Sequence, residues 1–366
     1  MKQIILTIGL AVSMLLSSLP SYAYDFEVDG IYYSVISPTD LTCEVVAGDN
    51  KYAGDVNIPS SVTYKSKQLD VISIGASAFE GCTGLTSVTI GNSVTSIGSV
   101  AFRGCIRLTG VTIGNSVTYI GIYAFQDCTG LTSVDIPDSV TSIGEYAFYG
   151  CIGLTGVTIG NSVTEIGRRA FMDCTGLTSV DIPDSVTSIG GSAFADCTSL
   201  TEVKISANVT ELYAYWTSSK DNAIFYGCSN IVNLTFNDSV EKLTLDNRKE
   251  YHSSVSSFPS PFYSLQLKEL YLGREINLKI YDSYYIYKYP ETLEKITFGP
   301  KLSDIGDFYR RISTIPTSAV IYCLNPTLRL SAMISLTHNI STTRSTSPRS
   351  HWRLTNRRTA GRISGI

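Results

Sequence analysis

The sequence predicts a β-rich solenoid, which is a rod of short stacked coils. Three observations support this prediction. Six phenylalanines recur at intervals of 23 residues: Phe79, Phe102, Phe125, Phe148, Phe171 and Phe194. Cysteine, leucine, valine and isoleucine follow each of them at fixed distances, so the whole segment keeps one period. Charged residues make up only 16% of the chain. A fixed period of about 20 to 50 residues is typical of solenoids, in which each repeat buries its apolar side against its neighbours.

Each repeat is expected to contain a strand, a turn and a returning arc. Residues 85–90 end in alternating apolar and polar side chains, so we expect a strand whose Val88 and Ile90 face the core. A Gly-Asn or Pro-Asp pair then turns the chain. A second apolar run, 94–97, ends at Gly98. The Ala-Phe pair beyond it is expected to begin a single helical turn or an irregular arc that closes the coil.

The repeat pattern IGxxAFxGCxxLTSVxIPxSVTxIG resembles that of the BspA-like leucine-rich repeat family of secreted bacterial surface proteins. The match is specific over the regular repeats and looser over about two thirds of the chain. The resemblance implies a leucine-rich-repeat solenoid with a parallel sheet on one face and short helical turns on the outer side. Members of the family are implicated in adhesion to host matrix proteins, host cells and other bacteria. No catalytic residues come with the family.

Residues 1–23 are typical of a secretory signal peptide. Lys2 precedes an apolar run at 4–16, and a small-x-small sequence ends at Ala23, after which we expect cleavage. A membrane helix is the alternative, but the run is well short of the ~20 residues that a span requires. No cysteine stands at the boundary, which disfavours a lipoprotein, and no later segment could span a bilayer. We therefore expect a secreted or cell-surface protein.

The rest of the chain divides into four parts by its register. Residues 24–72 are expected to form an N-terminal β cap over the open solenoid end, with a separate binding domain as the alternative. Residues 73–210 are the regular leucine-rich repeats, where a longer period of 46 residues indicates duplication of a repeat pair. Residues 211–326 are irregular repeats with insertions, which are expected to be loops. Residues 327–366 form a basic tail.

The insertions are rich in aromatic residues, which suit recognition of protein or sugar because they give rigid contact area with a polar tip. The alternative is that these rings cover the outer side of the solenoid or extend its strands. The candidate partner-binding residues in the insertions are Tyr213, Tyr215, Trp216, Tyr281, Tyr284, Tyr285 and Tyr287. On the exposed strand positions, which are expected to make a broad polar sheet, the candidates are Thr112, Asp135, Thr158 and Asp181.

The chain has nine cysteines, six of them in the repeat ladder. Secretion favours disulfides, and coils stacked at ~4.8 Å would bring neighbouring thiols within reach. However, each ladder cysteine stands at one fixed position, three residues before an inward leucine, as a small buried hydrophobe would. We therefore favour reduced packing thiols over disulfides.

No metal, cofactor or catalytic site is expected, and the protein is not expected to be an enzyme. No C-x-x-C occurs, and the three histidines lie outside the regular repeats. The aspartate pairs at 135/138 and 181/184 suit turns on a solvated face, because calcium requires more oxygen ligands in one loop. No nucleophile–base pair stands in a catalytic motif, and the regular repeats carry no basic patch for nucleic acid.

The basic tail has three interpretations. Residues 331–366 hold six arginines and no acidic residue. A disordered tail and a nucleic-acid or surface anchor are two of them. The third is a frameshifted C-terminal cap, because suitable codons for the tail, read one nucleotide out of frame, can spell the closing sequence that family members often carry. Codons incompatible with that second frame would end this hypothesis.

The function expected from the sequence is protein or cell adhesion through a solenoid face. The expected partners are extracellular matrix or cell-surface proteins, with glycans as a second class, and the protein is expected to be a monomer. A glycan-binding accessory protein that uses the Tyr/Trp insertions is one alternative. A structural spacer, suggested by the near-identical coils, is the other.

Overall fold

The computed structural model describes residues 24–209, 211–213, 224–239, 243–246, 266–274, 276–279, 292–302, 320–324, 340–344 and 352–356. In 211–213, 243–246, 276–279, 320–323, 340–344 and 352–356 only the backbone is described. The expected signal peptide, 1–23, lies outside these residues.

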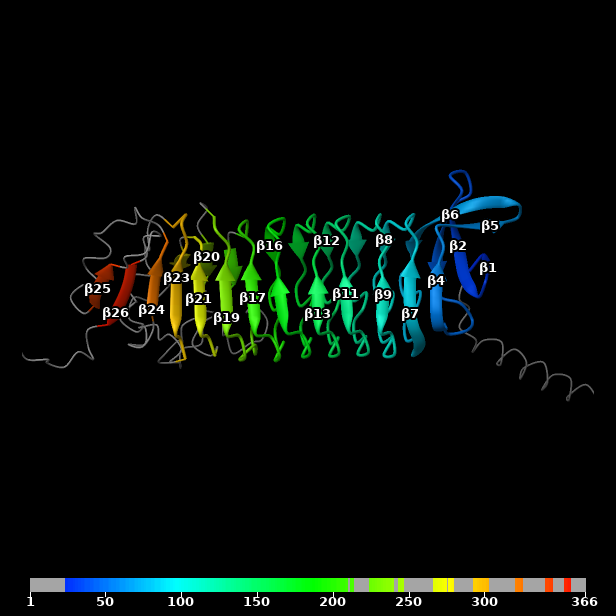
Figure 1. Ribbon diagram of the computed structural model, residues 1–366. Helices are drawn as coiled ribbons and strands as arrows, with labels where there is room; N and C mark the ends of the chain where they lie inside the picture. Colours follow the sequence, from blue (N-terminus) through cyan, green and yellow to red (C-terminus); the bar gives the residue numbers. More distant parts are fainter. Residues whose placement is uncertain are drawn as a thin grey trace, which may run out of the picture.

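The described residues form a solenoid of strands and turns without any helix, which confirms the predicted β-rich repeat fold. Figure 1 shows the coils stacked side by side along one long axis, with β1 near one end and β25 near the other. Two parallel ladders of strands and a row of turns run along this axis.

The first ladder contains the valine–isoleucine alternation of each repeat and is the predicted parallel sheet. Its strands are β4 (Ala53–Ile58), β7 (Gly84–Ile90), β9 (Gly110–Thr112), β11 (Ser133–Asp135), β13 (Gly156–Thr158), β15 (Ser179–Asp181), β17 (Glu202–Ile205), β19 (Asn233–Phe236), β21 (Glu269–Leu272), β23 (Lys295–Phe298) and β24 (Val320–Cys323). Strand pairing is interrupted between β9 and β11 and between β13 and β15, where the Thr132 N–H still donates to the Thr109 carbonyl at 3.4 Å and the Thr178 N–H to the Thr155 carbonyl at 3.3 Å.

The second ladder comes from the shorter apolar run of each repeat, so the coil has a sheet on two sides. Its regular strands are β8 (Ser96–Ile97), β10 (Tyr119–Ile120), β12 (Ser142–Ile143), β14 (Glu165–Ile166) and β16 (Ser188–Ile189). Farther along, β18 (Glu211–Tyr213), β20 (Leu243–Asp246) and β22 (Ile276–Lys279) form a separate parallel sheet.

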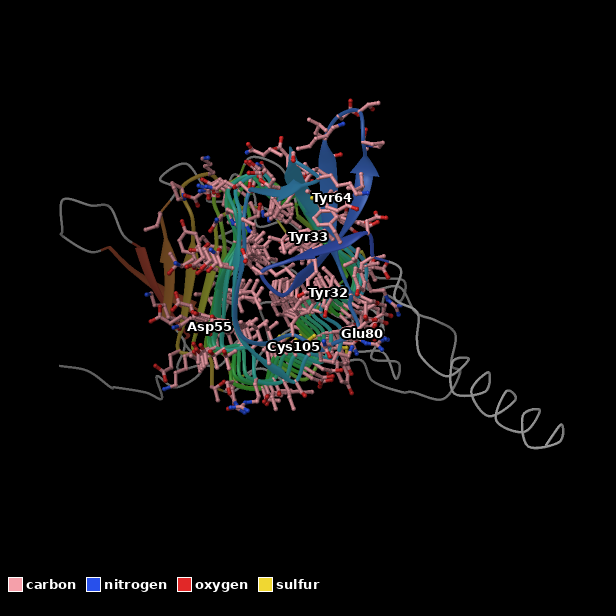
Figure 2. The ribbon with its side chains drawn as sticks, turned by 90° about the vertical axis from the view of Figure 1, so that its right-hand side faces the viewer. Tyr32, Tyr33, Asp55, Tyr64, Glu80 and Cys105 are labelled. Atoms are coloured by element: carbon pink, nitrogen blue, oxygen red, sulfur yellow. The ribbon has the colours of Figure 1, made fainter. Side chains whose placement is uncertain are left out.

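The N-terminal end is covered by strands β1 (Phe26–Val28), β2 (Ile31–Ser37), β3 (Thr42–Val46), β5 (Ser61–Tyr64) and β6 (Lys67–Ile74). β1, β2 and β3 pair antiparallel, and β3 then pairs in parallel with β6, which begins the second ladder. Tyr32 and Tyr33 point into the interior at this end (Figure 2) and are 5% and 1% exposed. Within the same segment, β4 already pairs in parallel with β7, so the first ladder starts before residue 73.

Two strands in the expected basic tail extend the first ladder at the C-terminal end. β26 (Trp352–Asn356) pairs antiparallel with β24, and β25 (Ile340–Arg344) pairs antiparallel with β26. The strand direction therefore reverses at the C-terminal end of the first ladder, after β24. At the N-terminal end it reverses among β1, β2 and β3, which lead into the second ladder.

The third side of each regular coil, here called the arc, consists of successive tight turns. It covers residues 76–82 and the segments at 99–105, 122–128, 145–151, 168–174 and 191–197. In the first arc, Glu80 N–H donates to the Ser77 carbonyl at 3.1 Å, and Phe79 N–H donates to Ala101 of the next coil at 2.7 Å. The sequence predicted either a helical turn or an irregular arc at this place. The structure shows tight turns, and hydrogen bonds between neighbouring coils join the arcs into a third row.

The phenylalanines stack along the core. Phe125 and Phe148 have ring centroids 5.1 Å apart with 3° between their planes, and the other pairs from Phe79 to Phe194 are similar. Each ladder thiol from Cys105 to Cys197 donates to the carbonyl of the phenylalanine 26 residues earlier, such as Cys128 Sγ to Phe102 at 3.1 Å. All eight described cysteines are buried and free, and burial raises the pKa of Cys151 to about 12. These thiols are neutral packing groups.

Candidate functional site

The outward side chains of the first ladder form one continuous surface, which we call the sheet face. They lie in two columns because alternate residues of a strand point to opposite sides. The first column is Asp55, Ser87, Gly110, Ser133, Gly156, Ser179, Glu202, Asn233, Glu269 and Lys295. The second column is Asn57, Thr89, Thr112, Asp135, Thr158, Asp181, Lys204, Thr235, Tyr271 and Thr297.

Four of the candidate residues lie together in the second column. Thr112, Asp135, Thr158 and Asp181 each end a strand of the first ladder and are exposed. Asp135 stands beside Thr158 in the parallel register, and Asp181 stands beside Lys204. The sequence-based placement of these side chains on one exposed face is therefore what the structure shows.

In the regular repeats the sheet face is shallow, because its side chains are small. A Cβ atom added at Gly110 or at Gly156 would meet nothing within 4 Å, so these positions leave open space. At the first end of the column, Asp55 accepts hydrogen bonds from Ser87 Oγ at 2.6 Å and from Thr86 Oγ1 at 2.8 Å. Both bonds lower the pKa of Asp55.

Charged side chains replace the small ones toward the other end of the face. Lys204 Nζ lies 3.1 Å from Asp181 and 3.9 Å from Glu202, and Lys295 Nζ lies 2.9 Å from Glu269. The hydrogen bond from Lys204 to Asp181 raises the pKa of the lysine. These side chains are 41–64% exposed, and an ion pair in such a position contributes about 0–1 kcal/mol. Their main effect is on the chemistry of the surface.

A hollow of about 250 Å³ opens on this charged part of the face, across β19, β21 and β23. It is lined by Asn233, Leu234, Thr235, Glu269, Leu270, Tyr271, Lys295 and Thr297. Tyr271 Oη donates to Asp238 Oδ1 at 2.8 Å, which holds the phenol in place. Burial and this hydrogen bond raise the pKa of Tyr271, so the phenol is neutral. The hollow thus combines an ion pair, an amide, two threonine hydroxyls and a phenol.

Arg274 joins the end of β21 to the turn after β17. It stands two residues after β21, and its side chain is fully buried. Its guanidinium donates to the carbonyls of Ser206, Ala207 and Val209 at 2.6 to 2.8 Å, in the turn after β17. Burial lowers the pKa of Arg274 to about 10, so it remains charged at neutral pH. A buried cation therefore joins segments more than 60 residues apart.

The aromatic candidates of the insertions fall where the structure describes little. Tyr213 ends β18, of which only the backbone is described. Tyr215, Trp216, Tyr281, Tyr284, Tyr285 and Tyr287 lie outside the described residues. Their role in binding stays a prediction. The sequence analysis did not single out the residues of the hollow. Tyr271 could have been found, because the strand pattern ELYL places its side chain outward.

Within the part of the chain that the structure describes, no three His, Cys, Asp or Glu side chains come together as a metal site would need. Within the same part, no helix has the length and hydropathy to cross a membrane.

Comparison with known proteins gives a matching family model and several similar solved structures. The model of the BspA type leucine rich repeat region matches in 6 copies, over residues 51–175, 118–244 and 177–309. A search of curated proteins finds no match.

Among solved structures, a leucine rich repeat protein of T. pallidum is 26% identical over 60% of this chain and 84% of its own, with a TM-score of 0.42. The pneumococcal vaccine antigen PcpA is 17% identical over 85% of this chain and 95% of its own, with a TM-score of 0.44. A leucine rich cell surface protein of Faecalibacterium prausnitzii is 21% identical over 84% of this chain and 96% of its own, with a TM-score of 0.28.

Proposed function

Because the chain belongs to the BspA-type leucine-rich repeat family, we propose that it is a secreted or cell-surface protein that mediates adhesion through its sheet face. The partner is an extracellular matrix or cell-surface protein, and the chain acts by binding and not by catalysis. The observation that carries this proposal is the hollow on the charged part of the face, where Tyr271 stands beside an ion pair.

The sheet face suits recognition of a large partner because it is broad and ordered in advance. Cross-strand hydrogen bonds hold the backbone, and Tyr271 and Lys295 are each held by a carboxylate. Side chains that are ordered before binding lose less conformational entropy when a partner docks. Tyrosine and charged groups around a hollow give anchors, and the flat Ser/Thr face beside it gives contact area.

Binding of the purified chain to immobilised collagen, laminin and fibronectin tests the proposal by biolayer interferometry. The site variant carries Tyr271→Thr and Glu269→Ser, which place on these strands the residue types of other strands in the same columns. The matched control is Val100→Ser, which lies on the arc and away from the sheet face and gives that coil the side chain that Ser77 carries at the same position of the preceding coil. We expect saturable binding that falls at least about 10-fold in the site variant and stays within about twofold in the control.

A folded site variant that binds as tightly as the unsubstituted chain would remove the hollow from the proposal. Absence of saturable binding to every matrix protein would favour the structural spacer.

A glycan is the second candidate ligand, and the same hollow favours it. Its asparagine, threonines and tyrosine are side chains that hydrogen-bond and pack against sugar rings. A glycan array probed with the same variants separates the two candidates, since a signal lost on Tyr271→Thr would replace the protein partner with a sugar. Loss on Trp216→Ala, or on Tyr284→Ala with Tyr285→Ala, would instead place the sugar at the insertions.

Export is a separate part of the proposal and has its own measurement. Expression of the full chain in a bacterium, followed by cell fractionation and mass spectrometry, reports where the protein goes and where it starts. We expect a mature chain outside the cytoplasm that begins at Tyr24. A cytoplasmic product that keeps residues 1–23 would contradict it.

A further inference from the structure

The regular coils are near-copies of one another, but their arcs differ. A glycine stands immediately before each arc, such as Gly75 and Gly98. Two residues after this glycine, the coils carry in order Ser77, Val100, Tyr123, Tyr146, Arg169 and Ser192. One residue after the stacked phenylalanine they carry Glu80, Arg103, Gln126, Tyr149, Met172 and Ala195. The sheet face of the same coils carries only Ser or Gly in one column and only Thr or Asp in the other, until Glu202 and Lys204. In the regular repeats, the outward residue types that differ from coil to coil therefore lie mainly on the arc.

The large side chains of the arc meet in three neighbouring coils. The rings of Tyr123 and Tyr146 stack with centroids 4.7 Å apart and 23° between their planes. The ring of Tyr149 meets Tyr146 edge-on at 5.8 Å. Arg169 Nη1 donates to Tyr146 Oη at 2.6 Å, and its guanidinium carbon lies 5.4 Å from the centre of that ring. The group is partly exposed and ordered by its own contacts.

The fold does not require these side chains. Tyr123, Tyr146 and Arg169 have left-handed backbones with φ of 57°, 56° and 54°. This conformation costs a non-glycine residue roughly 1–2 kcal/mol. Ser77 and Ser192 hold the same position in other coils with φ of 56° and 58°, so a small residue is sufficient there. Bulky residues kept in an unfavourable conformation point to a role outside folding.

Three exposed isoleucines stand in the same run of coils as the tyrosines. Ile106 is 48% exposed, Ile122 is 37% exposed and Ile152 is 51% exposed. Of the five large apolar side chains that are exposed among the described residues, four lie between residues 106 and 152. The neighbouring coils carry Thr83 and Thr129 where Ile106 and Ile152 stand, so isoleucine is again not needed for the coil. We call the tyrosines, Arg169 and these three isoleucines the arc patch.

We propose that the arc patch is a second docking surface, and that its occupant is a protein segment with apolar side chains next to a carboxylate. The isoleucines would receive the apolar side chains, while Arg169 and the hydroxyls of Tyr123 and Tyr146 would donate hydrogen bonds to the carboxylate. The hydroxyl of Tyr149 already hydrogen-bonds Asp173. Tyrosine and arginine are the residue types that dominate the binding energy of protein interfaces. Because the cluster is ordered by its own stacking, little side-chain entropy remains to be lost on docking.

A protein fits the arc patch better than a sugar does. Tyr123 of the preceding coil lies against the ring of Tyr146, and Arg169 of the following coil lies over that ring. Little of its face is open for a sugar ring to stack on. The edges and hydroxyls that remain, together with the aliphatic isoleucines, match apolar side chains and hydrogen-bond acceptors of a polypeptide.

The arc and the sheet face are separate surfaces. In the view along the axis, Asp55 of the sheet face and Glu80 of the arc lie on different sides of the coil (Figure 2). Two partners could therefore bind at the same time. The arc patch does not depend on the proposed function of the sheet face, and each surface can be removed without the other.

The test uses substitutions that other coils already contain. The arc variant carries Tyr123→Ser, Tyr146→Ser, Ile106→Thr and Ile152→Thr, and a milder second variant carries only the two isoleucine changes. Val100→Ser, in the same column outside the patch, and Tyr271→Thr on the sheet face are the matched controls. Equal melting temperatures of the milder variant and the unsubstituted chain establish that the fold is kept.

The probe is a phage-displayed library of random dodecapeptides selected on the full chain, with selected peptides then titrated by fluorescence anisotropy. We expect selected peptides to place apolar residues beside Asp or Glu. They should bind the arc variant at least about 10-fold more weakly and the milder variant measurably more weakly, with both controls unchanged.

Three results would overturn the proposal. Selected peptides could bind both arc variants as tightly as the unsubstituted chain. A glycan-array signal lost in the milder variant but kept in Val100→Ser would identify a sugar as the occupant. Sedimentation velocity could show a dimer that the milder variant dissociates, which would identify a second copy of the chain.

Discussion

The regular repeats (73–210) and the coils after the insertion (224–302, here called the divergent coils) bury the same pattern and expose different chemistry. Val180 and Ile182 of one region and Leu270 and Leu272 of the other are all buried. On the sheet face, the regular coils carry small polar side chains up to the Lys204–Asp181 pair at their last coil, while the divergent coils carry the Lys295–Glu269 pair and Tyr271. The comparison teaches that stacking of the coils constrains the residue types at inward positions. The outward residues are freer to differ, so each region carries its distinctive side chains on a different face.

The interiors of the two regions also differ in what holds neighbouring coils together. Within the regular repeats the phenylalanine rings stack nearly parallel, with 2° between Phe171 and Phe194. The next pair, Phe194 and Phe225, is 5.7 Å apart at 15°. Beyond it, Arg274 joins distant turns through three main-chain carbonyls. The regular repeats thus rely on a continuous aromatic stack, whereas a buried cation ties part of the divergent coils.

Phe148→Ala is expected to have the largest effect, because it interrupts the stack in the middle of the regular repeats. Phe148 lies 5.1 Å from both Phe125 and Phe171, and it is fully buried. We expect the free energy of unfolding to fall by about 4 kcal/mol in urea titrations followed by circular dichroism. Tyr149→Ala, one residue on and partly exposed, is the control and should cost much less. Equal losses would mean that the stack does not hold these coils.

Arg274→Met should come next and should act on the divergent coils. It removes the donors of the Ser206, Ala207 and Val209 carbonyls, and we expect a loss of about 3 kcal/mol. Hydrogen exchange should speed up at β17 and β21 and stay slow at β11. Arg103→Met, which removes an exposed ion pair with Glu80, is the control and should cost under about 1 kcal/mol. Uniform acceleration of exchange along the chain would contradict a local anchor.

Substitution by alanine should destabilise the fold at one glycine of the regular repeats and have almost no effect at another. A Cβ at Gly144 would lie 2.8 Å from backbone atoms of the preceding coil, whereas a Cβ at Gly110 would meet nothing within 4 Å. We expect Gly144→Ala to lower the free energy of unfolding by about 2 kcal/mol and Gly110→Ala to leave it within about 0.5 kcal/mol. Thermal melting of the two variants checks this. Similar melting temperatures would mean that coils can separate slightly at little cost.

The buried cysteine thiols of the regular repeats should make the stability of the fold depend on pH, by a smaller amount. Burial raises the pKa of Cys151 from 9.0 to about 12, so the folded thiol stays neutral while the unfolded one ionises. The stabilisation is complete below pH 9 and is lost as the pH rises from about 9 to 12. At pH 10 the loss of stabilisation is roughly 1 kcal/mol for Cys151. The fall in melting temperature between pH 8 and 10 should be smaller in Cys128→Ala with Cys151→Ala, and an unchanged fall would exclude the thiols as its cause.

Particular residues show how far the sequence alone could go. The 23-residue spacing of Phe79 and Phe102 predicted the solenoid, and the alternation around Val88 predicted which side chains face the core. The same alternation placed Thr112 and Asp135 on the exposed face. These inferences hold because each coil touches only its neighbours, so the inward pattern is written in short, repeated spacings.

Other features depended on the tertiary structure. The second ladder rests on strands of two residues, which are too short to predict from alternation. The hollow beside Tyr271 depends on the side chains of three strands separated by insertions, and the bond from Arg274 to Ser206 spans 68 residues. The contact of Tyr123, Tyr146 and Arg169 arises because stacking brings residues 23 apart to within about 5 Å. The sequence by itself determined which residues face inward, and only the stacked coils decided which outward side chains meet.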